Sequence, residues 1–371
     1  MWQDAIAAAM ETVRANIVSH PGRFPHITEG RKYEWGGNDD WIEGFYTGLA
    51  WLSYEYSGDE WFKAAAEAQL ESYAHRLKHH IVLDHHDIGF LYSPSAIAQW
   101  RITGHEGARE LALAAADKLA DRYRPAYGAI QAWGKEGDPA NGGRIIIDCL
   151  LNLPLLYWAH EQTGEQRYYD IATKHAQKSL RFLVRGDGSS YHTFYFDQGS
   201  GAALHGGTHQ GYQDGSTWTR GQAWGIYGFA LSYRYTKDPA YLDASKRLAL
   251  YYIEHLPEDH VAYWDFDVEI TEGTPRDSSA SAIAACGLLE LLEQLPLTDA
   301  DRNYFSGALS DMMGSLAETY STRSIRGAEG LLQHGSYHVR GERAPDDYMI
   351  WGDYFYLEAL VRMSRGIKGY W

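Results

Sequence analysis

Two aspartates have the sequence context that acid–base chemistry requires. Asp148 follows three isoleucines and precedes the run Cys-Leu-Leu, so its carboxyl group should be surrounded by hydrocarbon. Burial disfavours the charged form and raises the pKa of a carboxyl group, which suits a general acid. Asp87, at the end of residues 84–87 (Asp-His-His-Asp), is the second candidate. Glycoside hydrolysis usually requires paired carboxyl groups, although a buried aspartate can also be only a structural hydrogen-bond acceptor.

The two histidines of residues 84–87 raise the alternative of a metal site. No second cluster of His, Cys or Asp has recognisable ligand spacing, so we expect neither a metal nor another cofactor. Cys149 and Cys286 each lie in an apolar run, where a thiol usually behaves as a small buried hydrophobic group. They predict no disulfide, and a reducing, cytoplasmic compartment fits.

Aromatic residues are abundant, with 13 Trp and 28 Tyr. Aromatic rings stack on the C–H faces of sugars, while carboxylates and amides bind sugar hydroxyls. Most of these rings should belong to the core. Four tryptophans differ, because each lies next to glycine and polar residues in a loop or at the start of a helix: Trp41, Trp133, Trp218 and Trp224.

The elements that must position these residues follow a repeated pattern, in which an apolar helix, a short turn and a charged amphipathic helix succeed one another. The apolar segments are 41–56, 88–100, 145–160, 222–235, 280–295 and 354–363. The charged helices are 61–79, 108–122, 167–182, 241–255 and 300–320, and the N-terminal helix 2–18 supplies the sixth partner.

This repetition predicts an all-α protein with an (α/α)6 barrel, six inner and six outer helices, formed by residues 1–371 as one domain. Two or three ordinary domains, or an open helical solenoid, are the structural alternatives. Each apolar segment begins with a polar cluster, and in a barrel these ends would meet in one pocket. Asp and Ser in such clusters can also be simple helix caps.

Charge and hydropathy narrow the choice of partner. The formal net charge of −16 argues against nucleic acid, whose binding requires basic patches. No run of eighteen apolar residues predicts a membrane span, and the start of the chain lacks the basic and apolar regions of a signal peptide. An anionic substrate would need local cations in its cleft, because distant surface charge is screened beyond about 8 Å.

Several long segments resemble the bacterial unsaturated glucuronyl hydrolases, and the likeness extends over essentially the whole chain. The segments are 84–93, 142–156, 189–197, 207–211, 214–228, 276–282 and 351–354. The resemblance implies an (α/α)6 barrel that needs no metal. It also implies that Asp148 is the catalytic acid and base, and that Asp87 is a second required carboxylate.

The same resemblance implies the substrate-binding residues. His192 and Gln210 match residues around the uronate, and the pocket wall would consist of Trp41, Trp133, Trp224 and Arg220. We add His86 and Trp218, which adjoin these positions. Arg220, with His192 or His209, is our candidate for the positive charge that a carboxylate needs.

The implied reaction hydrates the C4=C5 double bond of a 4,5-unsaturated glucuronic acid at the non-reducing end of an oligosaccharide. One rival is an unsaturated rhamnogalacturonyl hydrolase with the same barrel and pectin-derived substrates. A rival from another class is a non-catalytic glycan-binding barrel. The sequence leaves open the penultimate sugar and whether the protein is a monomer or a dimer.

Overall fold

The chain folds into two concentric rings of helices. The computed structural model describes residues 2–29 and 32–371. The inner ring consists of α2 (Glu43–Ser57), the continuous run of α5 (Ile88–Tyr92), η1 (Ser93–Ile97) and α6 (Ala98–Thr103), then η2 (Ile147–Leu151) with α8 (Leu153–Thr163), α10 (Thr219–Thr236), α12 (Ser278–Gln294) and α14 (Ile350–Arg365). The outer ring consists of α1 (Trp2–Ser19), α3 (Glu60–Glu67) with α4 (Leu70–Lys78), α7 (Glu106–Ala120), α9 (Gln166–Leu183), α11 (Pro239–Glu254) and α13 (Arg302–Ser315) with η3 (Leu316–Tyr320).

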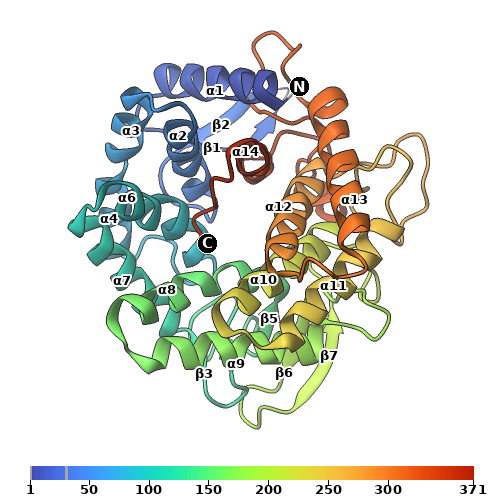
Figure 1. The fold of residues 1–371 in the computed structure, drawn as a ribbon. Helices are drawn as coiled ribbons and strands as arrows, with labels where there is room; N and C mark the ends of the chain where they lie inside the picture. Colours follow the sequence, from blue (N-terminus) through green and yellow to red (C-terminus); the bar gives the residue numbers. More distant parts are fainter. Residues whose placement is uncertain (1, 30–31) are drawn as a thin grey trace.

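Contacts between the inner helices close the ring. In order, α2 packs against α5, α5 against α8, α8 and η2 against α10, α10 against α12, α12 against α14, and α14 against α2. Figure 1 looks along the axis of this ring, with α10, α12 and α14 near the centre and α1, α9 and α13 at the rim. The fold is an alpha/alpha barrel, as the sequence predicted.

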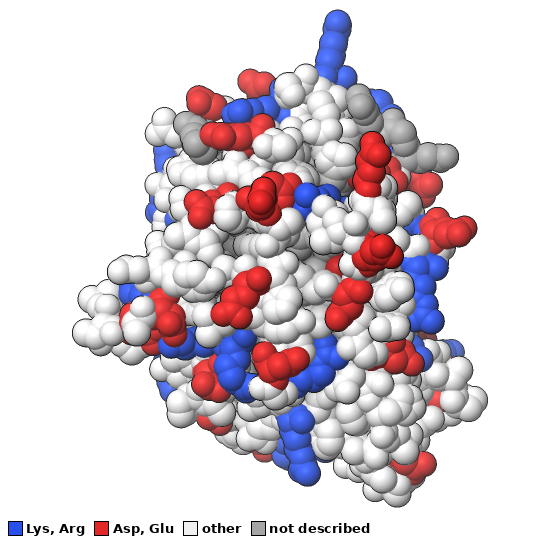
Figure 2. Space-filling view, turned by 90° about the vertical axis from the view of Figure 1, so that its right-hand side faces the viewer, with Lys and Arg blue, Asp and Glu red and all other residues white. Residues whose placement is uncertain are grey.

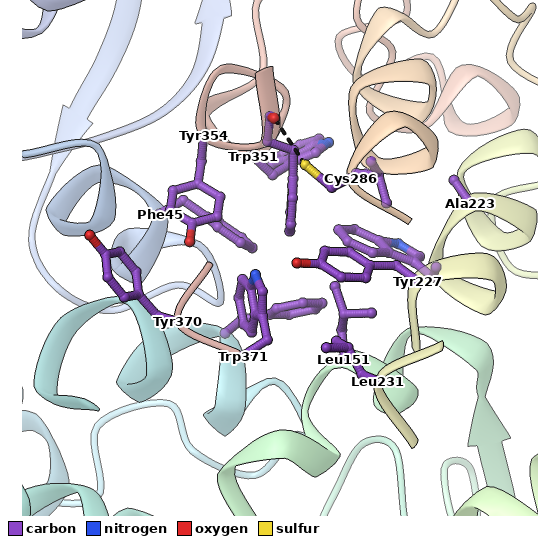
Figure 3. Packing of buried hydrophobic residues seen from close by; sticks show 14 of the residues in the cluster. Phe45, Leu151, Ala223, Tyr227, Leu231, Cys286, Trp351, Tyr354, Tyr370 and Trp371 are labelled. Carbon is purple, nitrogen blue, oxygen red and sulfur yellow. Dashed lines mark hydrogen bonds between the residues drawn. The ribbon is translucent and has the colours of Figure 1, made fainter. Parts of the chain in front are cut away.

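Burial follows the expected division between the rings. Residues 219–232 of α10 are buried without interruption, whereas α9 has buried residues on one face only. Aromatic side chains fill the middle of the barrel, where Phe45, Tyr354 and Trp371 converge (Figure 3). The ring of Trp371 is buried although it belongs to the last residue of the chain.

Short antiparallel strands lie in the segments that connect the helices. They form the pair β1 (Phe24–Glu29) and β2 (Lys32–Gly36), the pair β3 (Tyr123–Arg124) and β4 (Ala129–Ile130), and a sheet of β5 (Arg144–Ile146), β6 (Thr193–Phe196) and β7 (Ala203–Gly207). The register pairs Ile145 with Phe194 and Phe194 with Gly206. A 3₁₀ turn, η4 (Val339–Gly341), lies in the loop before α14.

Two predicted helices differ in detail from the structure. The prediction that one helix spans residues 145–160 is wrong at its start, because Ile145 and Ile146 are β-branched and pair with β6. The α-helical part begins only at Leu153, with Pro154 in its first turn, where proline is tolerated. In the helical run 88–103, Pro94 stands at the start of a π-helical turn.

No helix in the described part of the chain is long and apolar enough to span a membrane.

The face of the molecule on the α11 and α13 side carries Asp and Glu side chains scattered among Lys and Arg (Figure 2). Many of the acidic residues behind the negative net charge thus lie on the outer surface, among basic residues. These surface charges act from a distance on groups inside the barrel.

Candidate active site

A cavity of about 230 Å³ opens where the inner helices begin. Side chains reach it from the loops before α2 and α5, from β5 and η2, from the loops around β6 and β7, from the first turn of α10, and from the loop before α14. The lining residues are Trp41, His86, Asp87, Trp133, Ile146, Asp148, His192, His209, Gln210, Trp218, Arg220, Tyr337, His338 and Arg343. Four of the six polar clusters at helix starts meet in this pocket, as expected, whereas the clusters at the starts of α12 and α14 do not line it.

Ten of the eleven candidate site residues named from the sequence line this cavity. Trp224 is the exception, since its side chain is fully buried and packs on Phe90 and Phe355 with ring centroids 5.1 and 5.4 Å apart. The expectation that Trp224 belongs to the pocket wall is therefore wrong. Its indole N–H lies close enough to Asp148 to favour the carboxylate form but makes no direct hydrogen bond.

Asp148 has the environment of a general acid. Burial, reinforced by the negative charge of Asp87, raises the pKa of Asp148 to about 8, although Arg220 acts in the opposite direction. Its Oδ2 atom is buried without a hydrogen-bond partner, and the Nε2 atom of His192 is 3.9 Å away. At neutral pH the group is mostly protonated, with an oxygen available to a bound molecule.

Asp87 has the opposite tendency, although it is equally enclosed. Burial alone would raise its pKa, but His86 and His85 outweigh that effect and hold the pKa below its ordinary value. The nearest nitrogens are His85 Nδ1 at 3.3 Å from Oδ2 and His86 Nε2 at 3.4 Å from Oδ1. Two carboxyl groups in one pocket thus hold different protonation states, which is the arrangement that separates an acid from a charged partner.

His192 presents a defined tautomer to the pocket. Its Nδ1 atom accepts hydrogen bonds from the backbone N–H groups of His209 and Gln210, at 3.2 and 3.3 Å. Because Nδ1 accepts, the ring hydrogen lies on Nε2, which faces Asp148. Burial also lowers the pKa of His192 well below its usual value, so the ring is a neutral hydrogen-bond donor.

The expectation that His192 or His209 supplies positive charge is wrong at neutral pH. Burial lowers the pKa of His209 to about 4, so this ring is neutral as well. His209 instead packs edge-on to Trp133, with ring centroids 4.9 Å apart. Both histidines can offer hydrogen bonds to a ligand, but neither offers a charge.

Arg220 is charged but already engaged by protein groups. Its guanidinium pairs with the buried Asp277 and donates to the carbonyl oxygens of Ser336 and Tyr337, the latter at 2.7 Å. It lies over the Trp218 ring at 4.4 Å from the ring centroid. Asp277 also caps α12 by accepting from the Ala280 N–H. Arg220 thus joins α10, α12 and the loop before α14, and it fixes the pocket wall.

The loop before α14 contributes residues that sequence reasoning missed. Tyr337, His338 and Arg343 line the cavity, and the Arg343 guanidinium lies over the Tyr337 ring at 4.8 Å from the centroid. The Tyr337 carbonyl also accepts from Gln210 Nε2 at 2.8 Å, which ties the two sides of the cavity together. A dense run of aromatic and basic residues at 337–343 was the available signal. Ile146, which adds an apolar patch, was also missed.

No group of three or more His, Cys, Asp or Glu side chains within residues 2–29 and 32–371 is arranged to hold a metal ion. The pocket instead combines a protonated carboxyl, a charged carboxyl, neutral histidines and tryptophan faces. This combination can bind a sugar ring and transfer a proton to it.

Comparisons with known proteins agree with this chemistry. A model of the family described as Glycosyl Hydrolase Family 88 matches residues 11–294. The chain is 56% identical to the unsaturated glucuronyl hydrolase of Bacillus sp. (strain GL1), over 100% of this chain and 99% of that protein. It is 44% identical to the unsaturated chondroitin disaccharide hydrolase of Streptococcus pyogenes serotype M1, over 99% of this chain and 92% of that protein.

Solved structures show the same likeness in three dimensions. The crystal structure of the Bacillus sp. GL1 unsaturated glucuronyl hydrolase superimposes with a TM-score of 0.98, covering 100% of this chain and 99% of that one, at 56% identity. A mutant of the Streptococcus agalactiae enzyme, complexed with dGlcA-GalNAc6S, superimposes with a TM-score of 0.89 at 41% identity, covering 100% of this chain and 93% of that one.

Proposed function

The chain belongs to glycosyl hydrolase family 88 and is a glycoside hydrolase of the unsaturated glucuronyl hydrolase type, and from that premise we propose how its own residues perform the reaction. The substrate is an oligosaccharide whose non-reducing end is a 4,5-unsaturated glucuronic acid. The observation that carries the proposal is the pair of enclosed carboxyl groups whose pKa values are shifted in opposite directions.

The reaction begins with proton transfer from Asp148. The C4=C5 bond is an enol ether, so its π electrons take the Asp148 proton at C4 and leave an oxocarbenium-like centre at C5, shared with the ring oxygen. Water adds to C5 and gives its proton to the Asp148 carboxylate, which restores the acid. A carboxyl group with a pKa of about 8 serves in both steps, because it is protonated at neutral pH and strongly basic once ionised.

Product release needs no further catalyst. The C5 hemiketal opens by breaking its bond to the ring oxygen, which yields a ketone at C5 and a hemiacetal at C1. The hemiacetal then expels the neighbouring sugar as an alcohol. The net change is the addition of one water molecule, and no nucleophile attacks C1. The carboxyl spacing that distinguishes displacement mechanisms therefore does not apply here.

Asp87 acts through its charge and its hydrogen bonds. Its negative charge stabilises the cationic centre at C5, and it is the second cause, after burial, of the raised Asp148 pKa. His192 Nε2–H is placed to donate to an atom bound next to Asp148, and Trp41, Trp133 and Trp218 offer faces for the sugar rings. Gln210 and His86 complete the polar lining.

The names of the relatives indicate the class of oligosaccharide. They include an unsaturated chondroitin disaccharide hydrolase and a complex with dGlcA-GalNAc6S. We propose that lyase-generated disaccharides of glycosaminoglycan type, or related bacterial polysaccharide fragments, are the substrates. Arg343 adds a cation to the pocket beside Arg220, which supports an anionic ligand despite the acidic composition.

We also propose that residues 1–371 form one catalytic domain, since Trp41 and Tyr337 line the same cavity and α14 packs against α2. A cytoplasmic location is supported by two buried free thiols, Cys149 and Cys286, and cell fractionation tests this location.

The oligomeric state is a separate question, and gel filtration with light scattering distinguishes a monomer from a dimer.

The deciding experiment is turnover of a panel of unsaturated disaccharides, with and without sulfate, followed by loss of the ultraviolet absorbance of the double bond. Wild-type protein should consume at least one of them. Asp148→Asn keeps the size of the side chain but cannot donate the proton, so kcat should fall by about 10²–10⁴-fold with substrate still bound. If the variant retains most of its kcat, the assignment of Asp148 is wrong. If the wild type consumes no member of the panel, the proposed substrate class is wrong.

A further inference from the structure

Thr208 has no part in the mechanism above, although it contacts a residue that lines the cavity. It follows β7 directly, and its side chain is partly buried. The Oγ1 atom of Thr208 accepts a hydrogen bond from the backbone N–H of Gly211 at 2.8 Å. The same oxygen is 3.1 Å from Nδ1 of His192. The Thr208 hydroxyl therefore connects the loop of residues 208–211 to the His192 ring.

The contacts of His192 Nδ1 decide which group is the donor. The backbone N–H groups of His209 and Gln210 both point at this nitrogen, at 3.2 and 3.3 Å. A hydrogen on Nδ1 would face these two N–H groups, so Nδ1 carries only its lone pair. The oxygen of Thr208 already accepts from Gly211, and the hydroxyl hydrogen points at Nδ1. Three donors share this one lone pair, and the Thr208 hydroxyl is the nearest of them.

The Thr208 side chain also closes the turn that carries the two backbone donors. A threonine hydroxyl that binds a nearby backbone group can replace a backbone hydrogen bond in such a turn. The start of the turn is held by Asp214, whose Oδ1 atom accepts from the Thr208 backbone N–H at 3.1 Å. Its end is held by the bond from Gly211 to Thr208 Oγ1. The two N–H groups between these bonds converge on His192, and successive backbone N–H groups arranged in this way bind an electron-rich atom.

The turn is packed too closely to accept a side chain at its end. A Cβ atom at Gly211 would lie 2.7 Å from Thr208 Oγ1 and 3.0 Å from Asp265 Oδ2. Glycine thus allows the backbone N–H of residue 211 to approach the Thr208 hydroxyl. The Oδ2 atom of Asp265 also accepts from the backbone N–H of Tyr212 at 2.9 Å, which holds the residue after the turn. These contacts fix the segment 208–212 beside the cavity.

The remaining contacts of His192 fix its ring relative to Asp148. The ring packs on Trp218, with ring centroids 4.2 Å apart. The carbonyl oxygen of His192 accepts from the backbone N–H of Ile147, the residue before Asp148, at 3.0 Å. His192 Nε2 is 3.9 Å from Asp148 Oδ2, and burial lowers the pKa of His192, so the ring is neutral. The single ring hydrogen is therefore on Nε2, on the side of Asp148.

We propose that Thr208 is a positioning residue that holds His192 in the tautomer with its hydrogen on Nε2. In this tautomer the ring offers a hydrogen-bond donor to a substrate atom beside Asp148. The other tautomer would present a lone pair at Nε2, which would compete with the substrate for the Asp148 proton. The use of this donor in turnover rests on the proposed function. The tautomer itself does not, because it follows from the contacts of Nδ1.

The first test compares Thr208→Val with Thr208→Ser. Valine keeps the shape of threonine but can neither donate to His192 nor accept from Gly211, whereas serine keeps the hydroxyl. Thr208→Val should lower kcat/KM for an unsaturated disaccharide by about 2–10-fold, which corresponds to one neutral hydrogen bond. Thr208→Ser should restore most of that loss.

Thr274→Val is the matched control. The Oγ1 atom of Thr274 also accepts a backbone N–H, from Thr271 at 2.8 Å, but this loop does not line the cavity. Thr274→Val therefore removes the same kind of hydrogen bond and should leave kcat/KM unchanged.

A second measurement reads the tautomer directly and needs no turnover. In ¹⁵N-histidine NMR of the wild-type protein at neutral pH, His192 should show a protonated Nε2 and an unprotonated Nδ1. His192→Gln identifies these signals by their disappearance. A protonated Nδ1 in the wild type would overturn the proposal even if Thr208→Val failed to fold.

Three results of the activity test would also overturn it. These are a folded Thr208→Val variant with wild-type kcat/KM, a Thr208→Ser variant as impaired as Thr208→Val, and an equal loss in Thr274→Val. If the wild-type protein consumes no unsaturated disaccharide, the proposed function is wrong, and the NMR measurement alone decides the tautomer of His192.

Discussion

Replacing Asp148 with asparagine should stabilise the folded protein at neutral pH. In the unfolded chain an aspartate has a pKa of about 3.9. In the folded state burial and the charge of Asp87 raise the pKa of Asp148 to about 8. Between these two values the unfolded state gives up a proton that the folded state keeps. The free energy of unfolding of the wild type therefore falls as pH rises through this window.

The size of the effect follows from the width of the window. Each pH unit between the two pKa values changes the free energy of unfolding by about 1.4 kcal/mol. Asparagine has no such titration, so the difference between variant and wild type should grow by about 2.7 kcal/mol from pH 5 to pH 7. Asp148 Oδ2 has no hydrogen bond to lose on replacement. A net gain of about 2–4 kcal/mol at pH 7 is expected.

Urea unfolding at pH 5, 6, 7 and 8 measures this difference. Glu290→Gln is the matched control, since Glu290 is also buried but is paired with Arg234 and Arg362 at 3.3 and 3.0 Å. Despite burial, the two arginines lower the Glu290 pKa. Removing that charge should destabilise the protein at neutral pH by about 1–3 kcal/mol, because both arginines lose one charged partner, although Arg362 keeps Glu293 and Glu358.

The pH dependence is the part of this prediction that can refute it. A stability gain in Asp148→Asn that stays constant from pH 5 to pH 8 would mean that Asp148 is already ionised in the folded protein over that window. Destabilisation of this variant at all four pH values would mean that the Asp148 side chain makes structural contacts absent from the geometry described above. Either result would remove the physical basis for Asp148 as the general acid.

Three further outcomes follow from the site. Asp87→Asn should lower kcat strongly. It should also move the base limb of the kcat/KM profile down by about 1–3 pH units, because Asp87 no longer raises the Asp148 pKa. A base limb that does not move would contradict this coupling between the two carboxyl groups. Reaction in heavy water should place deuterium at C4 of the released keto sugar, as mass spectrometry or NMR can show, and an unlabelled product would exclude protonation there. Exhaustive chelation should leave turnover unchanged, whereas a loss restored by one metal ion would overturn the mechanism.

The helix pairs could be predicted because each leaves a local signature. A helix that is apolar on all sides must be buried, and a helix with one charged face must lie outside, so 222–235 and 241–255 could be assigned to the two rings. The secondary structure of residues 145–147 could not be predicted in this way, because three isoleucines fit a buried helix and a buried strand equally well. Pairing with β6, which lies some 50 residues away in sequence, makes residues 144–146 a strand.

Site residues could be predicted where they belong to a recognisable sequence motif. They could not be predicted where contacts between distant segments bring them to the pocket. Asp87 and Asp148 stand in recognisable segments at the starts of inner elements. The loop carrying Tyr337 and Arg343 has no periodic pattern, and contacts from distant elements fix its position. Asp353 accepts from the backbone N–H groups of Leu331 and Leu332, at 2.8 and 3.1 Å, and Arg220 binds the Ser336 and Tyr337 carbonyls.

Arg220 illustrates why charge counted along a sequence does not describe a site. The sequence made it a candidate partner for the substrate carboxylate, yet it is already paired with the buried Asp277. Its field still reaches Asp148, whose pKa it lowers, while burial and Asp87 raise that pKa by more. The protonation state of the pocket is thus decided by groups buried a few ångströms away. The surface acids behind the net charge of −16 are separated from it by the outer helices and screened by solvent.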